Sequence, residues 1–101
     1  MTHKILKDSI DKILKSVYQK KGDIFTEIAI NWSKIAGNEF AYQAIPISIN
    51  YYKTKETKKT CLVLQYEKGA NKLELKFSEA IIIERINHYF GFEAVMMLKF
   101  K

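Results

Sequence analysis

The stretch from Trp32 to Pro46 constrains the fold of this chain more than any other segment. It holds the only tryptophan and the only proline of the sequence, with Gly37 between them. Glycine readily leaves the helical conformation, and proline suits the start or the edge of a strand. We therefore expect a helix to end at Gly37 and a strand to begin near Pro46, with a large aromatic side chain beside this corner.

The length of 101 residues suits a single domain over 1–101, and an apolar fraction of 48% is ample for a packed core. No apolar run approaches the roughly 20 residues that cross a bilayer. The first residues lack a continuous apolar segment, so we expect no signal peptide and no membrane contact. The lone cysteine, Cys61, cannot form an internal disulfide, which fits a reducing cytoplasm best.

Apolar residues at helical spacing predict two helices in the first half of the chain. The first lies within 1–22, where Gly22 supplies the stop. The second runs from Asp23, a candidate cap, along an apolar stripe that includes Trp32 and ends at Gly37. A short helical remnant is expected over 38–42.

The apolar period changes to two after residue 44, which indicates a strand. A polar loop over 53–59 separates this strand from a second one over 60–66, and the two are expected to pair as an antiparallel hairpin. Four residues of the first strand are expected to share one face: Ile45, Ile47, Ile49 and Tyr51.

Residues 69–91 fit two patterns. Leu73, Leu75 and Phe77 alternate like a strand, but the whole segment also fits a helical face that ends at Gly91. Its length favours one long helix, and 94–100 then forms a third strand. The predicted fold is α+β in the order α-α-β-β-α-β, with a three-stranded sheet packed on helices.

Candidate catalytic groups are few, and we expect neither an enzyme nor a metal or cofactor site. His3 and His88 have no cysteine or paired carboxylate at ligand spacing. Cys61 lies in mid-strand, where a buried structural thiol is more common than a nucleophile. No glycine belongs to a phosphate-binding motif, so we expect no small-molecule substrate.

The order of Trp32, Ile35, Gly37, Ala41 and a proline that opens a strand resembles the first half of the DciA family of bacterial replicative-helicase loaders. The second half agrees in outline over the strand at 62–64, the long helix and the last strand. The resemblance covers about 24–101, and it leaves the helix within 1–22 as an addition.

This resemblance implies a fold similar to the K-homology domain and a partner, the hexameric DnaB-type helicase, that the protein helps to load onto DNA. It also implies that the protein is not itself an ATPase and works in the bacterial cytoplasm at the nucleoid. Many family members carry a further flexible extension that contacts the helicase or DNA, whereas this chain stops at the domain. The G-x-x-G loop of RNA-binding K-homology domains is missing here.

Trp32 matches the tryptophan of the family, so it is a candidate helicase contact together with Lys34 and Gly37. Its position on an apolar stripe suits a buried anchor equally well, and burial is the commoner outcome for such a residue. Both functions are compatible if only the edge of the indole reaches the surface.

The net charge of +6 is concentrated in two basic segments, 1–21 and 53–76, which suggests a polyanionic partner. Lysines beside exposed aromatics can hold a phosphate backbone while a ring stacks on a base, although a solvated loop has the same composition. A helix over 69–91 would also align three lysines as a ridge. The candidate nucleic-acid contacts are Tyr52, Lys53, Lys55, Lys58, Lys59, Lys68, Lys72 and Lys76.

The leading hypothesis is a non-enzymatic adaptor of DNA replication that binds the helicase and binds DNA weakly, as non-specific single strands. The alternative is a stand-alone module of similar fold that binds single-stranded nucleic acid or RNA without a helicase partner. A dimerisation module built on an exposed sheet edge is a third class.

Overall fold

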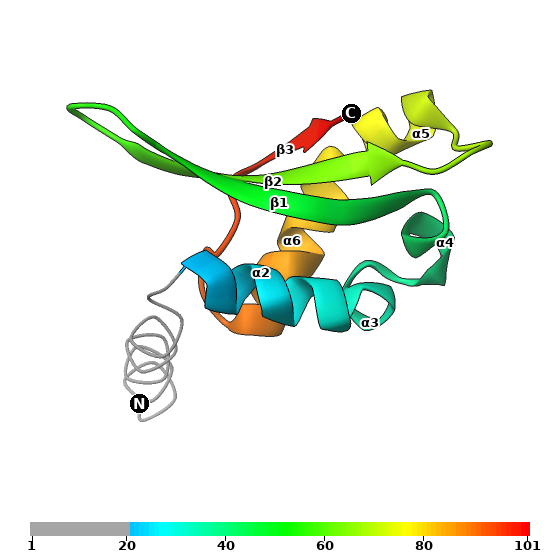
Figure 1. The fold of residues 1–101 in the computed structure, drawn as a ribbon, viewed down its shortest axis with the longest axis horizontal. Coiled ribbons are helices and arrows are strands. Elements are labelled where there is room, and N and C mark those ends of the chain that lie inside the picture. The colour runs from blue at the N-terminus through cyan, green and yellow to red at the C-terminus, as the bar shows by residue number, and fades with distance from the viewer. Residues whose placement is uncertain (1–20) are drawn as a thin grey trace, which may run out of the picture.

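The computed structural model describes residues 21–101, so the helix predicted within 1–22 falls almost entirely outside the described residues. The described chain has the predicted α+β class, in which helices precede and follow the hairpin of a small sheet (Figure 1). The elements are α2 (Lys21–Ile30), α3 (Trp32–Ala36), α4 (Asn38–Ala41), β1 (Ala44–Lys53), β2 (Lys58–Tyr66), α5 (Lys72–Phe77), α6 (Glu79–Phe90) and β3 (Met97–Phe100).

The helix predicted to start at Asp23 is divided into α2 and α3 by a turn at Asn31. The Asn31 side chain donates to the carbonyl oxygen of Glu27 at 3.1 Å, a local hydrogen bond of the kind that competes with regular helix. Gly22 lies within α2, so its prediction as a helix stop is wrong. Gly37 does end α3, with φ of 89° and ψ of 150°.

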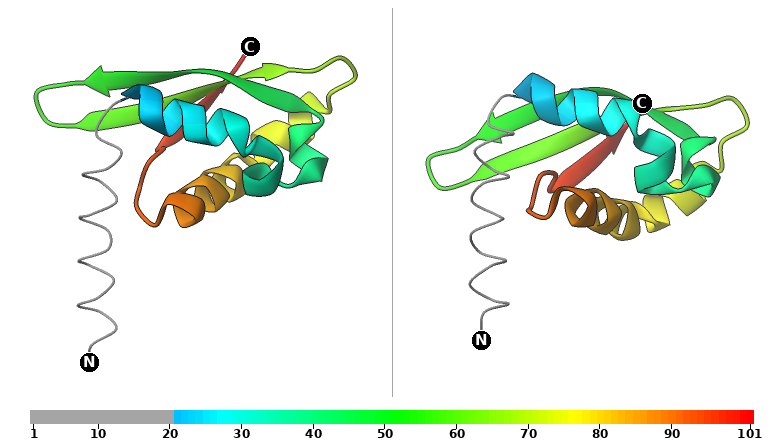
Figure 2. Two further views of the ribbon diagram at one scale, coloured as in Figure 1. Left: turned by 60° about the horizontal axis from the view of Figure 1, so that its bottom comes forward. Right: turned by 90° about the horizontal axis from the view of Figure 1, so that it is seen from below.

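The three strands form a mixed sheet in the order β1-β2-β3, with β2 at the centre. β1 and β2 pair as the predicted antiparallel hairpin, and β3 pairs with β2 in parallel. Helices α2, α3 and α6 lie on one side of the sheet (Figures 1 and 2). The core between them contains Ile28, Ile49, Leu62, Leu64, Ile82, Ile86 and Leu98 among its buried residues.

A bulge in β1 overturns the prediction that Ile45, Ile47 and Ile49 share a face. The register shifts between Pro46 and Ser48, so that Ile47 is an extra residue in its strand. An extra residue exchanges the two faces of a strand, because side chains alternate with a period of two. Ala44 and Ile49 are accordingly buried on the core side, whereas Ile45 and Ile47 are exposed.

Residues 72–90 are helical, but the single long helix predicted there is broken at Ser78 into α5 and α6. Asn71 caps α5, since its side-chain oxygen accepts from the backbone N–H of Glu74 at 3.1 Å. Gly91 ends α6 in the left-handed conformation, as predicted.

The last strand is shorter than predicted because Ala94 and Val95 are held by α6 instead of by the sheet, whereas the backbone N–H of Met96 donates to the carbonyl oxygen of Thr60 in β2 at 2.9 Å. The Asn87 side chain accepts from the backbone N–H groups of Ala94 and Val95 at 2.8 and 2.9 Å. It also donates to the carbonyl oxygen of Val95 at 2.8 Å. Within 21–101, no helix combines the length and the apolar character needed to cross a membrane.

Candidate functional site

Trp32 lies in the core at the junction of the helices and the sheet. Only 6% of its surface is exposed. Its indole Nε1 donates to the backbone carbonyl of Ala44 at 2.8 Å, and this hydrogen bond is buried. Trp32 therefore fastens α3 to the first residue of β1, which is the structural function weighed for it above.

Arg85, on α6, contacts the residues on both sides of Gly37. Its guanidinium Nη1 donates to the carbonyl oxygen of Ala36 at 2.6 Å, at the end of α3, and the group lies 5.3 Å from the centre of the Phe40 ring. A Cβ atom on Gly37 would come within 3.2 Å of the same nitrogen. Arg85 belongs to no motif of the sequence and was not among the predicted contacts, although it is the only arginine among 17 basic residues.

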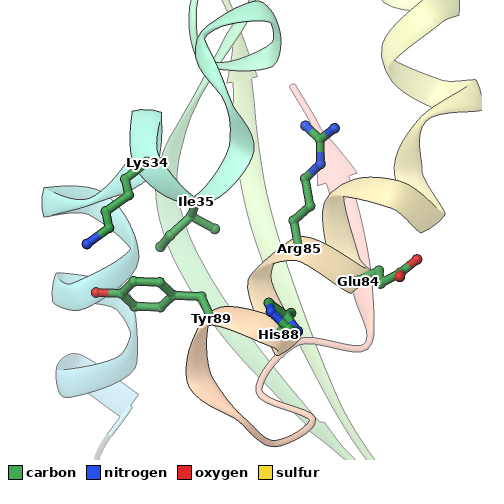
Figure 3. Close-up of a pocket in the computed structure, with 6 residues that line it drawn as sticks. All are labelled: Lys34, Ile35, Glu84, Arg85, His88 and Tyr89. Atoms are coloured by element: carbon green, nitrogen blue, oxygen red, sulfur yellow. The ribbon is translucent and has the colours of Figure 1, made fainter.

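A groove of about 410 Å³ lies between α3 and α6 (Figure 3). Lys34, one of the three predicted partner contacts, lines this groove from α3, and Ile35 lies beside it. Tyr89 is fixed in the wall because its hydroxyl donates to Glu27 Oε1 at 2.6 Å. The lining residues are Lys34, Ile35, Glu84, Arg85, His88 and Tyr89.

Large apolar side chains on the outside of α5 and the start of α6 form a second surface, which we call the apolar stripe. It consists of Leu73, Phe77 and Ile81, spaced four residues apart, with exposed fractions of 65%, 80% and 47%. In the sequence, these residues fit one helical face that continues to Gly91, and the structure shows them exposed. The period of the apolar residues could not separate this stripe from the buried stripe beside it, which contains Leu75, Ile82 and Ile86.

The hairpin tip carries five of the predicted nucleic-acid contacts, and all of them are exposed: Tyr52, Lys53, Lys55, Lys58 and Lys59. The turn between the strands is closed by Thr54 and Thr57. The backbone N–H of Thr54 donates to the carbonyl oxygen of Thr57 at 2.8 Å, and the two hydroxyl oxygens are 2.9 Å apart. The lysines therefore project from a turn of defined shape.

The predicted ridge of Lys68, Lys72 and Lys76 is wrong as a helical feature. Lys68 precedes α5, in a loop closed by the hydrogen bond from Ala70 N–H to Glu67 oxygen at 3.1 Å. Lys72 and Lys76 do share α5, and the ammonium of Lys72 lies 5.1 Å from the centre of the Tyr66 ring.

The two groups of lysines also lie at opposite ends of the hairpin (Figure 1). Lys58 begins β2 at the hairpin tip, whereas Tyr66, beside Lys72, ends it. At about 3.3 Å per residue, this strand of nine residues separates the two groups by more than 20 Å. The structure therefore does not bring the predicted nucleic-acid contacts together into one patch.

Among the described residues, the groups with reactive side chains are dispersed. Burial raises the pKa of the Cys61 thiol, which is therefore protonated at neutral pH. No group of three or more histidine, cysteine, aspartate or glutamate residues within 21–101 is placed to hold a metal ion. The surfaces of this part of the chain are suited to binding other macromolecules through apolar contacts and positive charge.

Comparison with known proteins identifies the relatives of this chain. It is 40% identical to an uncharacterized protein of Rickettsia prowazekii (strain Madrid E) over 92 residues, which are 91% of this chain and 85% of that protein. No solved structure matches. The model of the DciA family, described as Dna(CI) antecedent, matches residues 5–100. The chain belongs to the DciA family, a family of adaptors associated with loading of the DnaB helicase.

Proposed function

We propose that this protein is a non-enzymatic adaptor of DNA replication that binds the DnaB-type replicative helicase, assists its loading and holds DNA weakly. Membership of the DciA family over residues 5–100 is the observation that carries the proposal. This activity belongs in the bacterial cytoplasm, at the nucleoid. The described surfaces support a protein contact on α5 and α6 and a separate DNA contact at the tip of the β1–β2 hairpin.

The helicase contact, in this proposal, is the outer side of α5 and α6. The apolar stripe of Leu73, Phe77 and Ile81 exposes large side chains, and exposed apolar clusters typically mark protein interfaces. Farther along α6 the same helix lines the groove that contains Lys34. Trp32 and Gly37 then act from inside, because they fix α3 against the sheet and leave room for Arg85.

The DNA contact is the hairpin tip, where four lysines and Tyr52 are exposed. Lysines on an exposed surface attract phosphates without regard to base sequence, so the binding is weak and depends on salt. Lys72 and Lys76, and Lys68 in the loop before them, supply positive charge at the other end of the sheet.

Co-purification with the purified helicase tests the proposal. We expect the natural chain to retain the helicase and Phe77→Ser to lose it. Tyr42→Ser is the matched control, because Tyr42 is exposed to 79% and Phe77 to 80%. Circular dichroism should show that both variants keep the natural thermal unfolding midpoint.

Failure of the natural chain to retain helicase would refute the adaptor function. Equal retention by Phe77→Ser and the natural chain would instead refute the apolar stripe as the contact. In a pull-down from bacterial lysate, recovery of RNA or ribosomal material alone would support the stand-alone nucleic-acid-binding module.

A further inference from the structure

The outer end of the β1–β2 hairpin is a two-stranded ribbon. β3 pairs with β2 from Cys61 to Leu64, and the carbonyl oxygen of Thr60 accepts from the backbone N–H of Met96 at 2.9 Å, so within 21–101 the hairpin has no third strand from residue 59 outward. Two pairs of residues and the turn make up this outer part, which extends beyond the described helices (Figures 1 and 2). The pairs are Tyr52 with Lys59 and Lys53 with Lys58.

The register of these pairs places lysines on both faces of the ribbon. Directly opposed residues of an antiparallel pair share a face, and successive pairs alternate between the two faces. Lys53 and Lys58 therefore lie on one face, and Lys59 lies on the other face with Tyr52. Lys55 is in the turn at the end.

The last pair is unfavourable in the free protein. Two like charges directly opposite each other in a sheet repel, and Lys53 and Lys58 are such a pair at the outermost position. A phosphate chain beside this face would replace the repulsion with attraction. A single strand across one face would leave the lysine of the opposite face without a phosphate.

We propose that this ribbon enters the major groove of duplex DNA, with Lys53 and Lys58 toward one phosphate chain and Lys59 toward the other. This inference rests on the DNA-binding part of the proposed function. It replaces the single strand expected from the sequence, because only a groove presents phosphates on both sides of an inserted element.

The dimensions of the ribbon agree with those of the groove. Sheets stack about 10 Å apart face to face, so a ribbon with its side chains is about as thick as a groove about 12 Å wide, which admits a two-stranded ribbon. The two residue pairs and the bonded turn residues Thr54 and Thr57, at about 3.4 Å for each level, give a length of roughly 10 Å, which spans a groove about 8.5 Å deep.

In this proposal the lysines of both faces contact phosphates, and phosphate contacts carry no information about base sequence. Thr54 and Thr57 use their hydroxyl groups within the turn. The binding is therefore non-specific with respect to sequence.

Three nucleic acids of one length and sequence test this inference by fluorescence anisotropy: a DNA duplex, one of its DNA strands, and the RNA duplex. The major groove of A-form RNA is too deep and narrow for side chains to read. We expect the full chain to bind the DNA duplex more tightly than either of the others.

Variants of the two faces complete the test. The salt dependence of duplex binding is measured as the slope of log K against the logarithm of the salt concentration. The double variant Lys53→Ser/Lys58→Ser should lower the magnitude of this slope by about 2, and Lys59→Ser should lower it by about 1. Combining the variants should add the two losses. Lys99→Ser, at an exposed lysine of β3 outside the ribbon, is the control and should leave the slope unchanged.

Two results would overturn groove insertion while leaving DNA binding intact. One is equal or tighter binding of the single strand or the RNA duplex. The other is a duplex affinity that depends on one face of the ribbon only. Absence of binding to every nucleic acid at the lowest salt would refute the DNA-binding part of the proposed function as well, whereas helicase retention is measured separately.

Discussion

Trp32 and Tyr52 are two aromatic residues within two positions of a lysine and close to an end of a secondary-structure element, yet their environments are opposite. Trp32 is 6% exposed, and its polar atom is hydrogen-bonded to Ala44 inside the protein. Tyr52 is 46% exposed on a ribbon that has no third strand beside it. The Trp32 corner stabilises the fold, whereas the hairpin tip is available for a partner.

This difference in burial decides which of the two residues can be substituted to identify a binding contact. Removing Trp32 would disturb the core, so loss of helicase binding in such a variant would not identify a contact. Removing Tyr52 or its neighbouring lysines leaves the core untouched, so any loss of binding reports on the surface. The four predictions below test this separation.

The largest effect is expected for Trp32→Ala. It should lower the free energy of unfolding by about 3–5 kcal/mol, because it leaves a cavity and removes the partner of the Ala44 carbonyl. Tyr52→Ala should change it by only about 0.5 kcal/mol, as is usual at exposed positions. Urea denaturation of both variants measures the two losses of unfolding free energy. Similar losses would contradict the assignment of Trp32 to the core and of Tyr52 to the surface.

Gly37→Ala should lower the free energy of unfolding by about 1–3 kcal/mol, since φ of 89° with ψ of 150° is essentially restricted to glycine. The new Cβ would also press on Arg85 at 3.2 Å. Gly69→Ala is the matched control, because Gly69 has φ of 82° but open space around it. A larger loss at Gly69 than at Gly37 would show that the corner is not tightly packed.

Arg85→Met should lower the free energy of unfolding by about 1 kcal/mol, because it keeps the aliphatic part of the side chain but loses the hydrogen bond to Ala36. Thermal unfolding measures the loss. Lys34→Met, across the same groove, has no such bond to lose among the described contacts, and its midpoint should stay near that of the natural chain. Equal losses would assign the effect to surface charge.

The smallest effect, opposite in sign, is expected for Lys58→Glu. Opposite charges would then face each other in the outermost pair, which should raise the free energy of unfolding by about 0.2–1 kcal/mol. The same change should weaken duplex binding. A variant that is less stable but binds DNA normally would contradict both the register and the proposed role of the hairpin tip.

Much of the fold follows from local pattern. Gly37 and Gly91 end helices where predicted, and the change of apolar period near residue 45 marks the hairpin. Local pattern failed where two faces of one element were both apolar. The apolar stripe of Leu73, Phe77 and Ile81 has the same spacing as buried residues of the same helices, so periodicity alone could not show which stripe faces the sheet.

The candidate site was partly predictable. Clusters of lysine around a turn are visible in sequence, and the hairpin tip does expose Lys53, Lys55, Lys58 and Lys59. The register that distributes them over two faces, however, depends on the paired strand. Arg85 was missed because its partners, Ala36 and Phe40, lie more than 40 residues away in the chain.

The sequence by itself determined the α+β class, the corner between Trp32 and Pro46 and the location of the charged turn, because glycine, proline and apolar period act on neighbouring residues. Only the tertiary structure decided that Trp32 is internal, that the bulge at Ile47 exchanges the faces of β1, and that Asn87 holds residues 94–95 away from the sheet. These features depend on contacts between residues distant in sequence, whose geometry no local pattern encodes.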